Sequence, residues 1–174
     1  MLFRSLVIYM RHPRILRILT GPPYHRENDD DFALCASLGE DHVVVCGGTT
    51  ANIIERKLDK KVEIDLRMMR SCGDLPPPGR IPGVAVVTEG ILTLSRVCRA
   101  LEDGEVEYVP LSARMVLSRM MEHDRVEFIV GTKVNEAHQD PKLPVELELR
   151  RNMVKKIASL LEQKYRKETS INYY

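Results

Sequence analysis

The sequence has no excess of charge of either sign, no long apolar run and no paired cysteine motif. Lys and Arg number 26 and Asp and Glu number 25, which gives a formal net charge of +1. Domains dedicated to nucleic acid present a strongly basic face, so this balance argues against a nucleic-acid partner. No apolar run approaches the roughly 20 residues that are needed to cross a bilayer. Arg4, Arg11, Arg14 and Arg17 interrupt the N-terminal segment, which therefore does not resemble a signal peptide. We expect a cytoplasmic globular protein with no membrane partner.

The four cysteines lie far apart, at positions 35, 46, 72 and 98. No pair has the Cys-x-x-Cys spacing, and no Cys and His residues cluster at the spacing of a zinc finger. Reduced thiols, mostly buried as small apolar side chains, are the expected state. Asp29, Asp30 and Asp31 could suggest a divalent cation, but three adjacent residues on a helix do not face one site. We therefore predict no metal site, and the sequence requires no cofactor.

Hydrophobic residues make up 44% of the chain, which is enough for a core. Strand-like and helix-like segments alternate along it, and this alternation predicts a layered α/β fold. We expect a three-layer, Rossmann-like architecture in which a mostly parallel sheet carries helices on both faces. The expected strands are Ser5–Met10, Arg14–Leu19, His42–Cys46, Val62–Leu66, Val84–Val87, Val126–Val130 and Ser170–Tyr173. The expected helices are Glu27–Leu38, Ala51–Leu58, Ile91–Glu102, Ala113–His123 and Pro144–Lys164.

The clearest unit is a buried-type strand, His42–Cys46, which is followed at once by Gly47-Gly48-Thr49-Thr50 and a helix. Val62–Leu66 then alternates like a strand and completes a βαβ unit. Free backbone N–H groups at a helix start, together with the helix dipole, suit a phosphate or a carboxylate. Either threonine could bind that anion or cap the helix, and a tight packing turn is the alternative. The segment matches neither the P-loop nor the dinucleotide fingerprint, although Asp65 stands about where a ribose-binding acid would.

Four expected strands end in similar small or hydroxyl-bearing residues. Because the carboxyl ends of parallel strands lie on one edge of a sheet, these residues would meet where open α/β folds bind ligands. Small residues let a ligand approach the backbone and hydroxyls supply hydrogen bonds, although Gly and Thr are also ordinary turn residues. We predict a composite ligand-binding rim made of Thr20, Gly21, Gly47, Gly48, Thr49, Thr50, Asn52, Thr88, Glu89, Gly90, Gly131, Thr132, Asn135 and His138.

Two of these residues are also candidates for acid–base chemistry. Glu89 stands at a strand end, where it could bind a ribose or a metal, act as a base, or simply serve as an acid at a helix N-terminus. His138 is the histidine best placed for chemistry, although a loop histidine more often only forms hydrogen bonds. Cys46 could be a thiolate activated by the helix dipole, but the end of a buried strand is the favoured interpretation.

Several segments resemble a known bacterial family. They are similar to the C-terminal accessory region of the stage II sporulation protein E family of serine/threonine phosphatases. The similar segments are Ile18–Pro23, Val44–Ile53, Val87–Leu94, Gly131–Pro141 and Arg150-Arg151, and the resemblance extends over roughly Ser5 to Tyr173.

The family's phosphatase domain is a metal-dependent α/β sandwich, and only Arg4–Met10 resembles its closing strand. None of its metal-binding aspartates can be carried over to this chain, and Mg or Mn would belong to the missing domain. The resemblance implies that residues 1–12 are a remnant of that domain and that residues 13–174 form a single accessory domain. It also implies that this chain alone has no phosphatase activity.

The first functional hypothesis is a regulatory binding module. It would bind a small anion, such as a nucleotide, at the Gly-Gly-Thr-Thr rim and modulate a phosphatase domain that lies upstream or on a partner chain. The alternative is an enzyme that acts on a small phosphorylated or carboxylated metabolite, with Glu89 and His138 as acid–base candidates. A third possibility is a purely structural or dimerising domain, which would form a homodimer.

Overall fold

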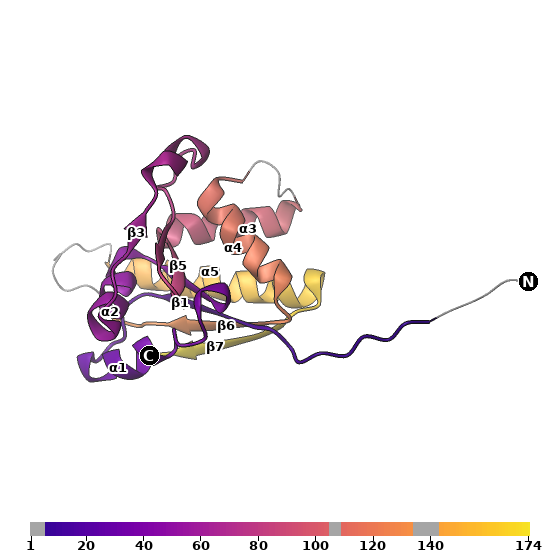
Figure 1. The fold of residues 1–174 in the computed structure, drawn as a ribbon, viewed down its shortest axis with the longest axis horizontal. Helices are drawn as coiled ribbons and strands as arrows, with labels where there is room; N and C mark the ends of the chain where they lie inside the picture. Colours follow the sequence, from indigo (N-terminus) through magenta and orange to yellow (C-terminus); the bar gives the residue numbers. More distant parts are fainter. Residues whose placement is uncertain (1–5, 105–108, 134–142) are drawn as a thin grey trace, which may run out of the picture.

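The computed structural model describes residues 6–104, 109–133 and 143–174. Their strands form one seven-stranded sheet in the order β3-β4-β5-β2-β1-β6-β7 (Figure 1). The strands are β1 (Ile15–Thr20), β2 (Val43–Cys46), β3 (Glu63–Ile64), β4 (Gly79–Ile81), β5 (Ala85–Thr88), β6 (Arg125–Val130) and β7 (Glu168–Tyr173).

Five consecutive strands are parallel, in the order β5-β2-β1-β6-β7, and β7 forms one edge of the sheet. The chain runs outward from β1 through β2 to β5, then crosses to the other side of β1 for β6 and β7. The strand order therefore reverses between β1 and β6, which is the topological switch point where open α/β sheets bind ligands. β3 and β4 extend the sheet with antiparallel pairing at one edge.

Helices cover both faces of the sheet, as the sequence predicts. One face carries α1 (Asp29–Leu34) and α2 (Gly48–Leu58), and the other carries α3 (Ile91–Asp103), α4 (Leu111–Glu122) and α5 (Leu143–Tyr165). Short 3₁₀ helices are η1 (Arg26–Asn28), η2 (Glu40–His42) and η3 (Leu66–Ser71). The predicted three-layer α/β architecture is confirmed.

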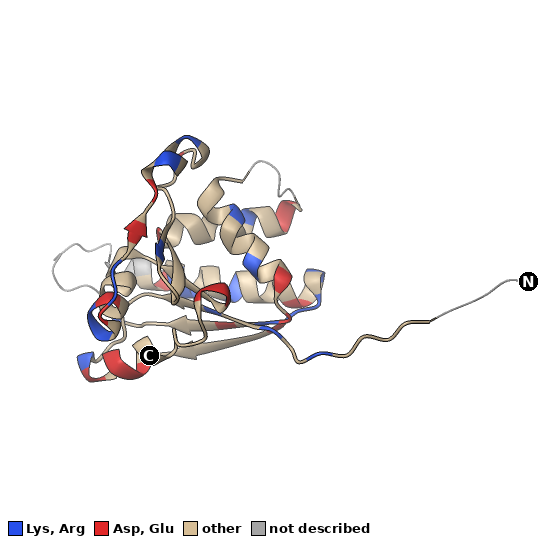
Figure 2. Cartoon of the chain, viewed as in Figure 1, with Lys and Arg blue, Asp and Glu red and all other residues tan. Residues whose placement is uncertain are grey.

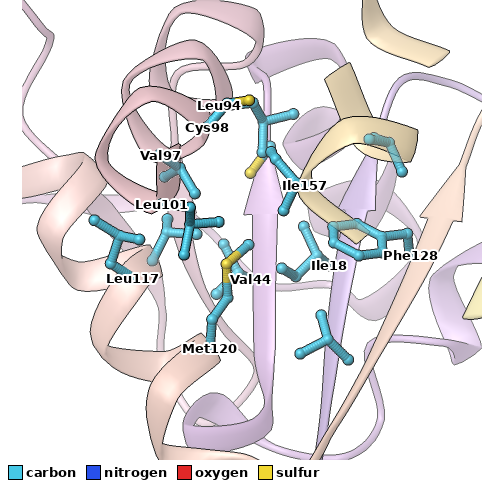
Figure 3. Packing of buried hydrophobic residues seen from close by; sticks show 14 of the residues in the cluster. Ile18, Val44, Leu94, Val97, Cys98, Leu101, Leu117, Met120, Phe128 and Ile157 are labelled. Carbon is cyan, nitrogen blue, oxygen red and sulfur yellow. The ribbon is translucent and has the colours of Figure 1, made fainter. Parts of the chain in front are cut away.

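The alternation of side chains along β1 explains this layering. Leu16 and Ile18 belong to the apolar cluster that contains Leu94 of α3 and Ile157 of α5 (Figure 3). Leu19 points to the opposite face and joins the cluster under α1 and α2. Both faces of the strand are apolar because both are covered by helices, as is typical of parallel sheets.

The structure corrects two expected strands. Residues 6–14 form neither helix nor strand, and the side chains of Leu6 to Met10 are 76–88% exposed, so the strand predicted at Ser5–Met10 is wrong for its described part. A strand needs a hydrogen-bonding neighbour, and no described strand lies beside this segment. Figure 1 shows it running away from the body of the molecule.

The second correction concerns Val62–Leu66. Only Glu63–Ile64 is a strand, it pairs antiparallel with β4, and the strand that follows α2 in the parallel sheet is β5. The predicted βαβ unit is therefore closed by β5. The chain between β3 and β4 forms an arm with η3 at its tip (Figure 1).

Basic and acidic residues are interspersed along the helices, strands and loops (Figure 2). Among the helices that the structure describes, none is both long and apolar enough to cross a bilayer.

Candidate functional site

The last residues of four parallel strands lie in one row across the sheet. Thr20 is paired in register with Cys46 on one side and Val130 on the other, and Cys46 is paired with Thr88. A cavity of about 450 Å³ opens beyond this row, and we call it the rim cavity. Its walls come from Thr20, Gly21, Pro22, Cys46, Gly47, Gly48, Thr49, Thr50, Glu89, Gly90, Ile91, Leu92, Lys133, Leu147, Leu149 and Arg150.

The predicted rim residues fall into three groups. Those that line the rim cavity are Thr20, Gly21, Gly47, Gly48, Thr49, Thr50, Glu89 and Gly90. Asn52, Thr88, Gly131 and Thr132 are not part of its lining. Asn135 and His138 lie outside the described residues.

Packing explains why three of the expected residues stay out of the cavity lining. Thr88 is buried beneath it, and its hydroxyl contacts the Cys46 sulfur at 3.5 Å. A Cβ atom on Gly131 would lie 2.1 Å from the carbonyl oxygen of Pro22, so this glycine lets the exits of β6 and β1 touch. The Thr132 hydroxyl donates to the backbone oxygen of Tyr174 at 2.7 Å.

The N-terminus of α2 opens into the rim cavity. Gly47 precedes the helix with φ of 113°, a left-handed conformation that favours glycine, and its N–H donates to the oxygen of Thr88 at 2.8 Å. No side chain caps the helix, and its first turn contains no acidic residue. The first N–H groups of a helix lack partners within the helix, so α2 offers donors and the positive end of its dipole to the cavity.

The starts of α1 and α3 differ from the start of α2. Glu89 lies just before α3, and its carboxylate accepts from the N–H groups of Leu92 at 3.0 Å and Thr93 at 3.3 Å. Its own chain therefore already supplies an anion to α3. The first turn of α1 carries Asp29, Asp30 and Asp31, which oppose binding of an anion (Figure 2).

The hydroxyl of Thr20 is buried without a hydrogen-bonding partner among the described residues, which is a second, independent observation at this site. The Thr20 side chain is 1% exposed. Because side chains alternate along a strand, Thr20 points to the same side of the sheet as Leu16 and Ile18, toward α3 and α5. Those helices provide a wall of the rim cavity, so the unused hydroxyl faces the cavity side. Buried hydroxyls are normally paired, which makes this one a candidate contact for a ligand.

Two basic residues outside the predicted rim line the cavity. Lys133 follows β6, and Arg150 comes from α5. A Cβ atom on Gly21 would lie 2.7 Å from Nη1 of Arg150, so the guanidinium rests on that glycine. The position of Lys133, directly after a predicted rim segment, could have indicated it. Arg150 is on a helix far away in the sequence, and only the tertiary structure brings it to the rim.

The Cys46 thiol has the properties of a core residue. Its side chain is completely buried, and burial raises the pKa of the thiol to about 12. A thiol with so high a pKa is protonated at neutral pH and is not a nucleophile. The interpretation of Cys46 as the end of a buried strand is therefore the better one.

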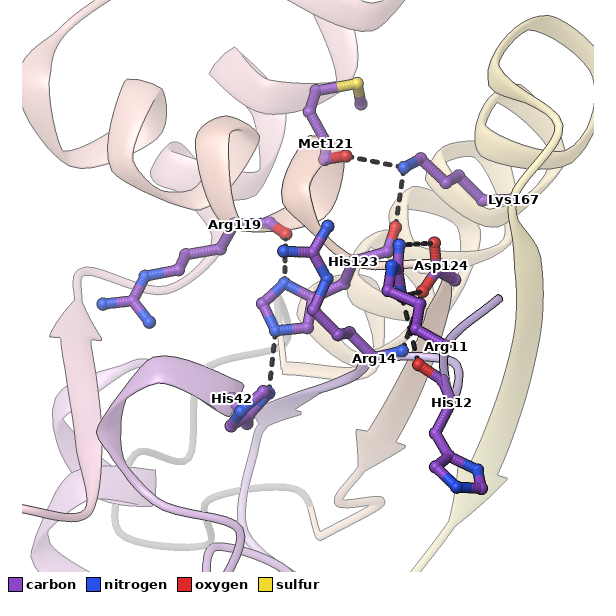
Figure 4. A network of polar contacts seen from close by, with 9 residues as sticks. All are labelled: Arg11, His12, Arg14, His42, Arg119, Met121, His123, Asp124 and Lys167. Atoms are coloured by element: carbon purple, nitrogen blue, oxygen red, sulfur yellow. Dashed lines mark hydrogen bonds and ion pairs between the residues drawn. The ribbon is translucent and has the colours of Figure 1, made fainter. Parts of the chain in front are cut away.

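A second polar cluster lies at the opposite edge of the sheet, where the strands begin (Figure 4). Nδ1 of His123 donates to the backbone oxygen of Arg119 at 2.7 Å, so neutral His123 accepts at Nε2 from Nδ1 of His42 at 2.9 Å. Lys167 donates to the oxygens of Met121 and His123, both at 2.6 Å. Arg11 binds the Asp124 carboxylate and lowers the pKa of that carboxyl well below its usual range. These contacts tie α4, β6 and β7 together far from the rim.

Among the described residues, no three His, Cys, Asp or Glu side chains are grouped so that they could hold a metal ion. No family model, curated protein or solved structure matches this chain.

Proposed function

We propose that this chain is a binding module that holds a small anion in the rim cavity. The observation that carries the proposal is the start of α2, which opens into the cavity with neither a side-chain cap nor an acidic residue in its first turn. The unpaired hydroxyl of Thr20 and the basic side chains of Lys133 and Arg150 lie in the same cavity wall and support it. Ligands of doubly wound sheets bind at this edge, next to the switch point.

The mode of binding differs from that of a dinucleotide-binding Rossmann domain. In those domains the turn after the first strand and the following helix hold the pyrophosphate. Here β1 is followed by Gly21-Pro22-Pro23, and α1 begins with three aspartates. Asp65, the candidate ribose ligand, caps η3 and accepts from the N–H of Arg67 at 3.0 Å, and it does not line the rim cavity. The anion therefore belongs on α2, after the second strand.

The enzyme hypothesis has less support. Glu89, its acid–base candidate, uses its carboxylate to accept two backbone N–H groups of α3. These contacts give the carboxylate a structural role at the start of α3. His138, its partner in that hypothesis, lies outside the described residues.

The binding proposal is tested by the substitution Gly48→Leu. Nothing lies within 4 Å of a Cβ atom at Gly48, so the leucine fits the fold but occupies the space in front of the α2 N–H groups. Isothermal titration calorimetry with inorganic phosphate, glycerol 3-phosphate, glucose 6-phosphate, AMP and ADP should show saturable binding to the parent protein. Gly48→Leu should weaken that binding at least about tenfold, which corresponds to 1.4 kcal/mol.

The matched control is Asn52→Leu, which places the same side chain on an exposed position of α2 outside the cavity. It should bind like the parent. The proposed function would be refuted if none of these compounds bound to the parent. It would also be refuted if Gly48→Leu and Asn52→Leu weakened binding equally.

We also propose that the module serves a phosphatase domain of the sporulation protein E family. The support is the sequence resemblance and the exposed apolar segment Leu6–Met10, which has the character of a surface that a second domain covers. A phosphatase domain of that family should co-elute with this chain in gel filtration. Val7→Ser combined with Ile8→Ser should reduce the co-eluting fraction, and co-elution that is insensitive to this change would contradict the role of the segment.

A further inference from the structure

The walls of the rim cavity also restrict the chemical class of the anion. This inference rests on the proposed function, because it concerns the ligand of the same site. It follows from three properties of the described residues: the number of open helix starts, the positive charge beside them and the apolar part of the wall.

Among the helix starts whose flanking residues the structure describes, one opens uncapped into the rim cavity. Of the two helices that begin in its wall, α3 is occupied by the Glu89 carboxylate and α2 is not capped by a side chain. The two starts are in contact, since a Cβ atom on Gly90 would lie 3.5 Å from Cα of Gly47. A second phosphate placed next to the first would therefore approach the carboxylate of Glu89. This arrangement favours one terminal anionic group and disfavours a pyrophosphate.

The charge of the wall fits a doubly charged group. A helix N-terminus acts like a charge of about +0.5, the ammonium of Lys133 adds one unit, and the formal charges of Arg150 and Glu89, which also line the cavity, cancel. Among the described residues, Lys133 has no ion-pair partner, and the carboxylate of Glu89 is stabilised by α3. A phosphate monoester carries a charge of about −1.5 to −2 at pH 7, which matches this sum better than the single charge of a carboxylate.

The remaining wall accepts an apolar group. Ile91 and Leu92 from α3 and Leu147 and Leu149 from α5 line the cavity, and Leu92 and Leu149 are 58% and 48% exposed. The volume of about 450 Å³ lies in the range of sites for small organic ligands, and it exceeds what one phosphate ion fills. Burial of these leucines against a ligand would add hydrophobic free energy to the electrostatic attraction.

We propose that the ligand is a small phosphomonoester, with its single terminal phosphate on the start of α2 and an apolar or aromatic body against the leucines of α3 and α5. Lys133 neutralises the phosphate. The hydroxyl of Thr20, at the floor, donates to a ligand oxygen.

Calorimetry with phenyl phosphate, inorganic phosphate, benzoate and pyrophosphate tests this proposal on the parent protein. Phenyl phosphate should bind at least about tenfold tighter than inorganic phosphate, which lacks the apolar body, and tighter by a similar factor than benzoate, which carries one charge. Pyrophosphate should bind no tighter than inorganic phosphate. The affinity for phenyl phosphate should also rise between pH 5 and pH 7, because the second pKa of a phosphate ester is about 6.

Two pairs of variants assign the contacts. Lys133→Gln should weaken binding of phenyl phosphate at least about tenfold, whereas Lys155→Gln, an exposed lysine on α5, should not. Thr20→Val should weaken it about threefold to tenfold. Thr93→Val removes another buried, unpaired hydroxyl outside the cavity lining and should have no effect.

The outcomes separate the two proposals. The phosphomonoester inference is wrong if benzoate or pyrophosphate binds best, or if Lys133→Gln binds phenyl phosphate like the parent. The proposed function stands in either case, provided that Gly48→Leu still abolishes binding. If none of the four compounds and none of the metabolites binds, both are wrong.

Discussion

At the scale of single residues, the rim shows that glycines at strand ends have different physical roles. Gly47 is required for its backbone conformation, with φ of 113°. Gly131 is required because the exits of β1 and β6 touch at its Cα. Gly48 has an ordinary backbone conformation and open space around it, so the fold does not require a glycine there. Gly48 is therefore the glycine of the rim at which a substitution tests the proposed ligand site without disturbing the fold.

This difference predicts opposite effects of alanine at two of these positions. Gly131→Ala places a methyl group 2.1 Å from a backbone oxygen, and the neighbouring loop must move. We expect it to lower the free energy of unfolding by about 3 kcal/mol. Gly48→Ala should leave it unchanged or raise it by up to about 1 kcal/mol, because alanine favours a helix. Urea denaturation of both variants measures these values, and equal stabilities would contradict the assigned close approach.

At the scale of secondary-structure elements, the three helices that follow β1, β2 and β5 begin in different ways. α1 begins with aspartates, α3 is preceded by Glu89, and α2 begins with glycine and threonine. These differences are visible in the sequence, because the residues that create them are local. Which helix starts face the same cavity is not visible there, because it depends on strand order. The sequence alone made the start of α2 a candidate anion site, and the position of β2 between β1 and β5 shows that this start shares a cavity with the start of α3.

The buried His123, between α4 and β6, should make the free energy of unfolding depend on pH. His123 is 3% exposed, and burial lowers its pKa, with His42, Arg14 and Arg119 adding repulsion. The unfolded chain therefore binds a proton more readily than the folded one. The contribution of His123 to stability is complete above the unfolded pKa of about 6.5 and is lost as the pH falls through the folded pKa.

We expect the free energy of unfolding of the parent protein to fall between pH 7 and pH 5. In His123→Gln, which has no titrating ring, this fall should be smaller, although the variant is less stable at pH 7 because it loses the ring's hydrogen bonds. His12→Gln changes an exposed histidine and should keep the parent's pH profile. Chemical denaturation at a series of pH values gives the slopes, and equal slopes for the parent and His123→Gln would rule out this residue as the source.

At the scale of the whole molecule, the body and the N-terminal segment are physically distinct. All seven strands belong to one sheet with a core on each face. The side chains of Leu6 to Met10 lie outside both cores and remain in solvent. A run of five exposed apolar residues favours association with another surface, and it contributes little to the folding of the body.

The double substitution Val7→Ser with Ile8→Ser tests this separation. These side chains are 88% and 76% exposed, so their replacement should change the free energy of unfolding by less than about 0.5 kcal/mol. The variant should also scatter less light than the parent at high concentration, because it presents less apolar surface. The pair Val44→Ser and Ile18→Ser, in the core, should prevent folding (Figure 3). A marked loss of stability in the Val7 and Ile8 variant would show that the segment packs on the body in solution.

Local patterns were enough to predict most of the elements. The strands at His42–Cys46 and Val126–Val130 and the final strand of the chain were expected close to where they occur, because uninterrupted apolar or β-branched runs identify them. The prediction failed at Ser5–Met10 and at Val62–Leu66. Both segments have residues that favour an extended chain. A strand also needs a neighbouring strand to which it can hydrogen-bond, and the tertiary structure determines whether one is present.

The sequence by itself determined the three-layer fold and the gathering of small residues at one edge, because apolar periodicity and turn chemistry are local. Tertiary structure decided which of those residues face a cavity. Thr88 is buried and Gly131 packs against the backbone of Pro22, whereas Gly48 and Thr20 line the cavity. It also decided the charge of the site, because Arg150 reaches the rim from α5 and lies in the same wall as Lys133. Contacts between residues far apart in the chain are set by strand order and helix packing, and no local pattern encodes them.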